Sequence, residues 1–385
     1  MKHASVLLAV GLLLAGVAPA ADSLNVRLVG SCDTPGAAVG VAVSGDHAFV
    51  ADMSPGLRVI SVADPTHPVE VGYCDSGFAS GVAVVGDYAY VTDDEAGLRI
   101  LSIADPAHPV EVGFCQTPRY AVDVALAGNH AYVANEASGL RVISVVDPSH
   151  PVEVGHCDIP GVSRRVAISG SHAYVAAYAA GLRVISIADP ANPVEVGHLD
   201  LPDLAYDVDV SGQYVFVADD DAGVRIVDVG DPANPEEVGV MNAPPWTSTP
   251  AVAVAGDYAF TGCTDATLRV ALVADKQHPV EVGFYGSTGI PSDIAISGGY
   301  EYVGVGASGL QIYEFYGAGV EESPKPPTPK RKLEPTVLSE ASGVSRLASS
   351  VVFDAMGRRV LSPRSGVYFV REAQAQAIRK VVVTK

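Results

Sequence analysis

The sequence predicts an all-β chain: a seven-bladed β-propeller over residues 22–316, followed by a small β-sandwich-like tail. Two observations support this prediction. An Asp-Pro turn recurs at intervals of 41, 42, 42, 42 and 44 residues, at Asp64, Asp105, Asp147, Asp189, Asp231 and, as Asp-Lys, at Asp275. Each interval also holds four short β-rich segments separated by turn residues. Four short antiparallel strands in a repeat of about 42 residues are typical of a propeller blade.

The second repeat illustrates the elements of one blade. Its expected strands are 81–85, 88–92, 98–103 and 110–115. Gly86-Asp87 is a two-residue sequence that favours a hairpin turn between the first two strands. Asp105-Pro106 favours a turn before the fourth strand, and Pro109 suits the start of an edge strand, where a missing N–H costs little.

The number of repeats predicts how the ring closes. The hairpin sequence occurs seven times, starting at Gly45, Gly86, Gly128, Gly170, Gly212, Gly256 and Gly298. The outer-strand sequence Pro-Val-Glu-Val-Gly, or a close variant of it, follows only six of them. Residues 25–32 carry the same Val-Gly-x-Cys pattern at the other end of the chain. We therefore expect this N-terminal segment to be the outer strand of the seventh blade.

The repeated segments Ala-Tyr-Val-Ala, Gly-Leu-Arg-Val-Ile-Ser-Val and Asp-Pro-x-x-Pro-Val-Glu-Val-Gly resemble the LVIVD repeat family of bacterial and archaeal surface or secreted proteins. The resemblance covers about three quarters of the chain. It implies an extracellular propeller, and it brings no shared catalytic residues.

The first 21 residues have the pattern of an export signal. Lys2 and His3 precede an apolar run from Val6 to Val17, and Ala18-Pro19-Ala20 supplies small residues for cleavage. No later segment is long and apolar enough to span a bilayer. We expect a protein that is secreted or attached to the cell surface, with no membrane span.

Residues 317–335 are rich in Pro and Lys and predict an extended linker. Residues 336–385 resemble the C-terminal sorting domain of the type IX secretion system. The residues that match are Asp354, Gly357, Gly366, Tyr368 and Lys380. The resemblance implies contact with the secretion machinery; a plain structural cap is the alternative.

Charge and cysteine usage narrow the function classes. Residues 1–320 hold 12 basic and 38 acidic side chains, which argues against nucleic-acid binding because phosphates are repelled.

Four of the five cysteines occupy one repeat position, where neighbouring copies lie too far apart for a disulfide bridge. We expect no disulfides, and a monomer.

The first residues of the inner strands form a column that should ring the mouth of the central channel. Asp123, Arg165, Asp207 and Asp293 are its charged members. Three carboxylates around one guanidinium predict either a ligand site or a structural network, and we favour the network. The third-strand arginines recur in six repeats, so we expect them to form ion pairs with the recurrent Glu or Asp.

Other candidates lie on loops of the same face. Trp246, the only tryptophan, suits stacking on a sugar or anchoring a partner, or else covers a gap between blades. Arg119 and Tyr120 lie in a comparable loop. Asp93, Asp94, Asp219 and Asp221 are weak calcium candidates, because their spacing departs from a calcium loop.

Two functions from different classes remain open. The first is an exported binding or adhesion scaffold for a protein or glycan, without cofactor or chemistry of its own. The second is an extracellular hydrolase, lyase or lactonase-like enzyme, with Asp123, Asp207, Asp293 and Arg165 at the channel mouth. No nucleophile–base motif, phosphate-binding loop or Cys/His metal motif is present.

Overall fold

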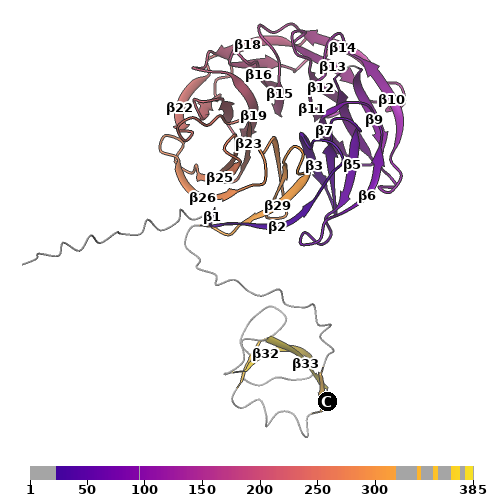
Figure 1. Ribbon diagram of the computed structural model, residues 1–385, viewed down its shortest axis with the longest axis vertical. Helices are drawn as coiled ribbons and strands as arrows, with labels where there is room; N and C mark the ends of the chain where they lie inside the picture. Colours follow the sequence, from indigo (N-terminus) through magenta and orange to yellow (C-terminus); the bar gives the residue numbers. More distant parts are fainter. Residues whose placement is uncertain are drawn as a thin grey trace, which may run out of the picture. The chain divides into compact units, whose positions relative to one another are not determined.

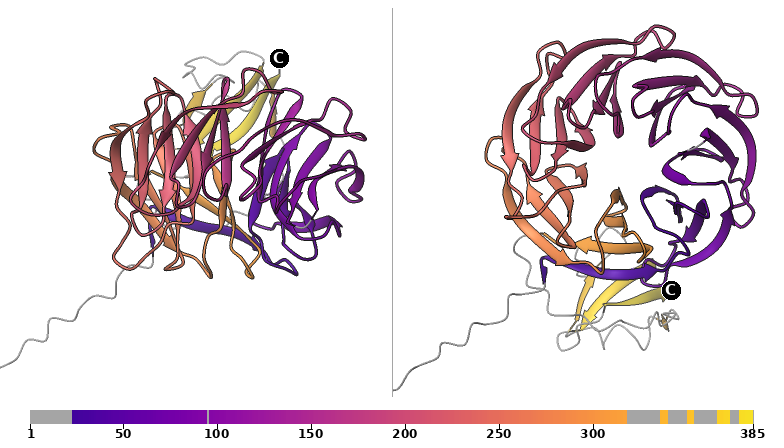
Figure 2. Two further views of the ribbon diagram at one scale, coloured as in Figure 1. Left: turned by 90° about the horizontal axis from the view of Figure 1, so that it is seen from above. Right: turned by 45° about the horizontal axis from the view of Figure 1, so that its top comes forward.

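The computed structural model describes residues 23–94, 96–317 and four strands between residues 336 and 384. Seven antiparallel sheets stand around a central channel (Figure 1; Figure 2). Strands follow one another from the channel outward in each of the first six blades, and the first strands of neighbouring blades lie side by side. The predicted seven-bladed propeller is confirmed.

The first three blades each contain four strands, and those of blade 2 match the predicted segments to within two residues. Blade 1 is β3 (Gly40–Ser44), β4 (His47–Ala51), β5 (Leu57–Ser61) and β6 (Val69–Cys74). Blade 2 is β7 (Ala79–Val85), β8 (Tyr88–Asp93), β9 (Gly97–Ser102) and β10 (Val110–Gln116). Blade 3 is β11 (Asp123–Ala127), β12 (His130–Ala134), β13 (Leu140–Ser144) and β14 (Val152–Cys157).

The next three blades repeat this order. Blade 4 is β15 (Arg165–Ser169), β16 (His172–Ala176), β17 (Leu182–Ser186) and β18 (Val194–Leu199). Blade 5 is β19 (Ala205–Ser211), β20 (Tyr214–Asp219), β21 (Val224–Asp228) and β22 (Glu236–Met241). Blade 6 is β23 (Ala251–Ala255), β24 (Tyr258–Cys263), β25 (Thr267–Leu272) and β26 (Val280–Gly286).

The seventh blade joins the two ends of the propeller. It consists of β27 (Asp293–Ser297), β28 (Tyr300–Gly304), β29 (Leu310–Phe315) and, as predicted, the N-terminal β2 (Val26–Cys32). β2 pairs with β29 in an antiparallel register from Val26↔Phe315 to Cys32↔Leu310. The register shifts at Leu28/Gly30, and a shift at the same repeat position occurs in all six other outer strands. β2 therefore has a β-bulge at the same position as the outer strands of the other six blades.

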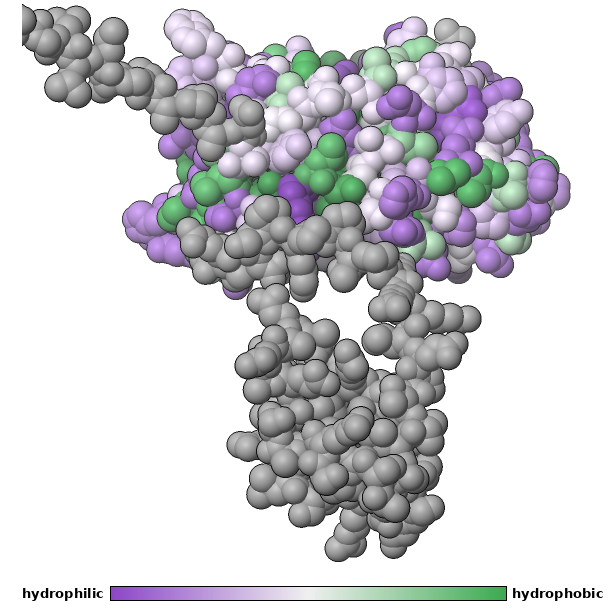
Figure 3. All heavy atoms as spheres, turned by 60° about the horizontal axis from the view of Figure 1, so that its bottom comes forward, coloured by the Kyte–Doolittle hydropathy of each residue, from purple (hydrophilic) through white to green (hydrophobic). Residues whose placement is uncertain are grey.

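A short strand that the sequence analysis missed extends the sixth blade. β1 (Ser23–Leu24) pairs with β26, which makes this sheet five-stranded. The Leu24 carbonyl lies 2.9 Å from an ideal Cβ at Gly283, whereas the equivalent Gly155 faces the Pro190 carbonyl of the next blade's Asp-Pro turn at 2.3 Å. β1 thus takes the place of the turn that the seventh blade lacks. Figure 3 shows hydrophobic residues among hydrophilic ones on this closing side, and Leu24 and Leu28 are exposed there.

The core is divided into seven layers, one between each pair of neighbouring blades. Between blades 3 and 4, for example, Leu140 and Val142 pack with Val175 and Ile185, all fully buried. Alternate residues of a strand point to opposite faces, so each middle strand contributes to the layers on both sides of its blade. Because every blade needs a neighbour on each face, closure of the ring buries the last two open faces.

Ion pairs tie the third strand of six blades to the outer strand, as predicted for the recurrent arginines. The N–O distances are 3.5 Å for Arg58–Glu70, 2.8 Å for Arg99–Glu111, 3.3 Å for Arg141–Glu153, 3.4 Å for Arg183–Glu195, 3.5 Å for Arg225–Glu237 and 2.9 Å for Arg269–Glu281. Blade 7 carries Gln311 at this position, and Arg27 of β2 instead pairs with Glu314 of β29 at 2.6 Å. The recurrent arginines thus have a structural role within each blade.

All five cysteines are free, in agreement with the prediction of no disulfides. Cys32, Cys74, Cys115 and Cys157 are only half-buried. Cys263, the fifth cysteine, ends β24 and is fully buried. Burial raises the pKa of the Cys263 thiol, which favours the unreactive thiol form.

Glu301 is a buried carboxyl at the closing interface. It lies in β28 at the position that the other blades fill with alanine or, in blade 5, with Val215, and it is 3% exposed. Its Oε2 has no hydrogen-bond partner among the described residues. Burial raises the pKa of Glu301 from 4.5 to about 8. Folding therefore becomes less favourable as the pH rises from 4.5 toward 8, because the unfolded chain ionises this group first.

We predict that Glu301→Ala stabilises the propeller by on the order of 2–4 kcal/mol at pH 8.5 and by much less at pH 5. Urea unfolding at the two pH values measures the difference. Glu111→Ala, which removes the surface ion pair with Arg99 in blade 2, is the control and should cost about 1 kcal/mol or less at both pH values. A gain for Glu301→Ala that is equal at both pH values would contradict the explanation by ionisation.

The C-terminal part forms a separate compact unit from Glu321 to Lys385. Its described strands β30 (Thr336–Ser339), β31 (Ser350–Phe353), β32 (Gly366–Glu372) and β33 (Ile378–Thr384) form one sheet in the order β30-β33-β32-β31. Of the matching residues of the sorting domain, Gly366 and Tyr368 lie in β32 and Lys380 lies in β33. Asp354 and Gly357, the export signal and residues 318–335 lie outside the described residues. Among the described residues, no helix is long and apolar enough to cross a membrane.

Candidate ligand-binding site at the mouth of the channel

The charged column predicted from the sequence meets at one end of the channel. Arg165 begins β15 in blade 4, and its Nη2 donates a hydrogen bond to the Val39 carbonyl, just before the first strand of blade 1, at 3.2 Å. Its Nε lies 3.8 Å from Asp207 Oδ1 in blade 5. Since blades 1 and 4 are not neighbours in the ring, the Arg165 side chain extends across the channel.

The three aspartates of the column bind the backbone of the following blade. Asp123 Oδ2 accepts from the Val166 N–H at 2.9 Å. Asp207 Oδ2 accepts from the Val252 N–H at 2.8 Å, and Asp293 Oδ2 accepts from the Val41 N–H at 2.6 Å. The first strand of a blade is an edge strand with N–H groups that need a partner, and these carboxylates supply it. Asp209, which the sequence analysis did not single out, does the same for the Val254 N–H at 2.7 Å.

Burial and mutual repulsion change the titration of this group. Burial raises the pKa of Asp207 to about 8, although Arg165 lowers it, and burial also raises the pKa of Asp293. Burial works against the charged form of Arg165, but Asp123, Asp293 and Asp207 together raise its pKa. At neutral pH the Asp207 carboxyl next to the Arg165 guanidinium is therefore mostly protonated.

A cavity of about 310 Å³ lies on the propeller axis next to Arg165. Each of the seven blades contributes one residue to the wall of this cavity, and each of these residues directly precedes a member of the charged column. They are Val39, Ser80, Val122, Arg164, Tyr206, Pro250 and Ser292. Asp94, Tyr120 and Glu136 add side chains from the surrounding loops. Because one residue comes from each blade, this cavity is the mouth of the channel. We refer to it as the mouth cavity.

Aromatic and cationic groups are gathered on one side of the mouth cavity. The Arg164 guanidinium lies 5.6 Å from the ring centroid of Tyr206, and Tyr178 meets Tyr206 edge-on at 5.5 Å. Burial, with a contribution from Tyr178, raises the pKa of Tyr206 to about 12. The phenol of Tyr206 therefore stays protonated and can donate a hydrogen bond.

Comparison with protein families decides the identity of the propeller. The LVIVD repeat model matches seven times, at residues 35–76, 76–117, 118–159, 160–200, 204–243, 248–287 and 288–313. The chain belongs to the LVIVD repeat family. The matched repeats span all seven blades, so the resemblance inferred from the sequence is confirmed for the propeller. A search of curated proteins finds no match.

Solved structures show the same fold as this LVIVD propeller at low sequence identity. The WD40 repeats of RRP9 match with a TM-score of 0.62 and 13% identity, covering 75% of this chain and 97% of that chain. The propeller domain of Myceliophteria thermophila Cps50 (Swd1) matches with a TM-score of 0.62 and 11% identity, over 75% and 99% of the two chains. The computationally designed Ika8 protein matches with a TM-score of 0.56 and 9% identity, over 75% and 99%. These similarities concern the fold alone.

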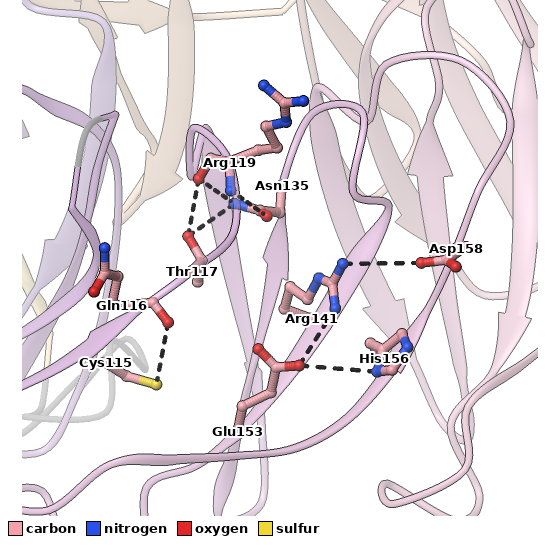
Figure 4. Close-up of polar contacts among 9 residues, drawn as sticks. All are labelled: Cys115, Gln116, Thr117, Arg119, Asn135, Arg141, Glu153, His156 and Asp158. Carbon is pink, nitrogen blue, oxygen red and sulfur yellow. Dashed lines mark hydrogen bonds and ion pairs between the residues drawn. The ribbon is translucent and has the colours of Figure 1, made fainter.

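The predicted loop residues of the LVIVD propeller lie in different places. Tyr120 is half exposed and lines the mouth cavity. The backbone of Arg119 is held by Asn135, which also bonds Thr117, while the Arg119 guanidinium points away from the other residues drawn (Figure 4). Of these two predicted ligand-binding residues, the structure thus places Tyr120 in the wall of the mouth cavity and Arg119 on the exposed loop beside it.

Trp246 lies in the long loop between β22 and β23. Its side chain is completely exposed, and its backbone has φ +65°. It therefore does not cover a gap between blades. A second cavity, of about 220 Å³, is lined by Asn242–Pro244 of the same loop and by Cys263 and Arg269 of blade 6.

The aspartates suggested as weak calcium ligands have other partners. Asp93 accepts from Arg99 Nε at 2.8 Å and Asp219 from Arg225 Nε at 3.2 Å. Two further contacts are Ser80 Oγ to Asp94 and, at 2.8 Å, Ser248 Oγ to Asp221. No group of three His, Cys, Asp or Glu side chains suited to a metal is found among the residues that the structure describes.

The sequence analysis missed Arg164, Tyr206 and Glu136. It followed the column of charged residues and did not examine the column one residue earlier, where Arg164 and Tyr206 are the only large polar or aromatic members. The difference between these two large residues and the smaller residues of the other repeats at this position is visible in the sequence. Glu136 gave no such signal, because only the fold brings its loop to the axis.

Proposed function

We propose that this LVIVD propeller is an exported binding protein whose mouth cavity recognises a sugar residue of a glycan. The observation that supports this best is the composition of the cavity wall. Tyr120 and Tyr206 offer aromatic faces, while Arg164, Ser80 and Ser292 offer hydrogen-bond donors and acceptors. Sugars present both apolar ring faces and hydroxyl groups, and a concave site with a few polar groups suits them.

The arrangement of the aspartates favours binding over catalysis. Both Asp207 oxygens accept backbone N–H bonds, from Val208 and Val252, and both Asp293 oxygens do the same with Ile294 and Val41. A general base needs a free oxygen within reach of the substrate. Asp207 and Asp293 are thus engaged in holding blades together.

We predict that Tyr206→Ala weakens glycan binding by the mature full-length chain at least about tenfold, since one stacked aromatic is worth roughly 1.5 kcal/mol. A glycan array identifies the ligand, and isothermal titration measures the affinity. Tyr73→Ala, which removes an exposed tyrosine from outer strand β6, is the matched control. Unchanged affinity in folded Tyr206→Ala would overturn the mouth cavity as the glycan site.

Trp246 supplies a second contact in this proposal. A fully exposed tryptophan on the loop face suits the remainder of a glycan chain or a protein that displays it. The N-terminal signal and the C-terminal sorting-type unit support an exported location. Fractionation of cells that express the chain with and without residues 1–21 tests it, and mass spectrometry of the secreted product tests removal of the tail.

A hydrolase, lyase or lactonase-like activity is the second candidate. One observation favours it: burial raises the pKa of Asp207 to about 8, and shifted carboxyls are frequent in active sites. Product analysis after prolonged incubation with the bound glycan tests this. Turnover that disappears in Asp207→Asn would establish the enzyme over the scaffold.

A further inference from the structure

Resting on the proposed glycan site, we infer that the mouth cavity selects a sugar carrying a protonated amine, such as a glucosamine residue, over N-acetylated and acidic sugars. Three features of the cavity lead to this ligand class: the charge beneath it, the charge of its wall and its aromatic faces.

The only guanidinium at the base of the cavity is already compensated. Arg165 faces Asp123, Asp207 and Asp293, and its Nη2 is bonded to the Val39 carbonyl. All three carboxyls interact electrostatically with the Arg165 guanidinium. Arg165 therefore offers no surplus positive charge to an acidic ligand.

The wall adds further negative charge. Asp94 and Glu136 both line the cavity, and besides Arg165 the cation among the lining residues is Arg164. Arg164 follows Ser163, whose backbone pairs with that of Glu136. The Glu136 carboxylate has no hydrogen-bond or ion-pair partner among the residues that the structure describes. Asp94 is engaged with Ser80. Glu136 is thus the carboxylate that is open to a ligand ammonium group.

The tyrosines complete a site for a cationic sugar. Tyr120 is half exposed at the cavity wall, and Tyr206 lies across from it in the next blade but one. Aromatic faces attract cations through the negative charge density of the ring. A carboxylate together with aromatic faces favours an ammonium group, whereas a carboxylate-bearing sugar would meet repulsion from Glu136 and Asp94.

Titration of the mature full-length chain with β-1,4-linked tetramers tests this. We expect the glucosamine tetramer to bind at least about tenfold more tightly than the N-acetylglucosamine tetramer at pH 6, a ratio that one ion pair in a partly buried site can provide. A β-1,4-linked glucuronic acid tetramer should bind most weakly. Glu136→Gln keeps the shape of the side chain and should bring the first two affinities within about twofold of each other.

Glu236→Gln, on the exposed outer strand β22, is the matched control and should keep the preference. Equal binding of the glucosamine and N-acetylglucosamine tetramers by the unmodified chain would overturn the amine preference while leaving a glycan site in place. Tighter binding of the acidic tetramer would also overturn it. If neither these nor any arrayed glycan binds, the proposed function falls together with this inference.

Discussion

Removing residues 22–32 from a chain of residues 22–385 should destabilise the propeller by at least about 4 kcal/mol. The segment supplies β1 and β2, and Val26 is fully buried in the layer between blades 6 and 7. A buried apolar side chain contributes about 1.5–3 kcal/mol, and each cross-strand pair adds about 0.2–1 kcal/mol. Loss of β2 also exposes the edge of β29, so we expect the shortened chain to aggregate.

Urea unfolding of chains 22–385 and 33–385, together with size-exclusion chromatography, checks this. Arg27→Ala is the control, because it removes only the ion pair with Glu314, in which Arg27 is about half exposed. We expect that change to cost less than about 1 kcal/mol. If the shortened chain unfolded at the same urea concentration as the longer one, β2 would not be needed to close the ring.

Arg165→Leu should cost about 3–5 kcal/mol at pH 8, because it leaves buried carboxylates without a counter-charge. The folded-state pKa values of Asp207 and Asp293 are already above the value of 3.8 in an unfolded chain. A carboxyl whose pKa is raised on folding lowers the free energy of unfolding progressively as the pH rises from its unfolded-state pKa toward its folded-state pKa. Without Arg165 the free-energy cost of burying these carboxyls grows. This cost disappears only at a pH low enough for the carboxyls to be protonated in the unfolded chain as well.

The loss in Arg165→Leu should therefore be much smaller at pH 4 than at pH 8, as measured by thermal unfolding over a pH series. Arg164→Leu is the matched control: Arg164 is the preceding residue, half-buried in the wall of the mouth cavity, and it has no ion pair with any residue that the structure describes. We expect it to change stability by about 0.5 kcal/mol or less. A loss for Arg165→Leu that is the same at both pH values would mean that Arg165 contributes by packing and not by charge.

Much of the fold could be predicted because each blade repeats the same local pattern. The outer strand of blade 7 was recognisable at the N-terminus from Val-Gly-x-Cys alone, and even its bulge follows the repeat. β1 could not be predicted, since Ser23–Leu24 has no counterpart in the repeats and pairs only because blade 7 lacks a turn. The repeats therefore allow the strands of the blades to be predicted, but not β1, the short strand that closes the ring.

The site was only partly predictable for a geometric reason. The column containing Arg165 and Asp207 was found, and the choice of a structural network agrees with its hydrogen bonds. Which residue of each blade faces the mouth cavity depends on the tilt of the inner strands. The column one residue earlier, with Arg164 and Tyr206, was therefore missed. No pattern within one repeat indicates that Glu136 reaches the axis.

The contact between Gly155 and the Pro190 carbonyl, at an ideal Cβ distance of 2.3 Å, has a consequence for the spacing of the blades. Backbone touches backbone at the outer circumference, where a given change in spacing alters the angle between two blades least. The equivalent glycine makes the same approach to the next blade's turn in every blade except blade 6. The spacing between blades is therefore set at the circumference, and the residues at the axis are free to diverge.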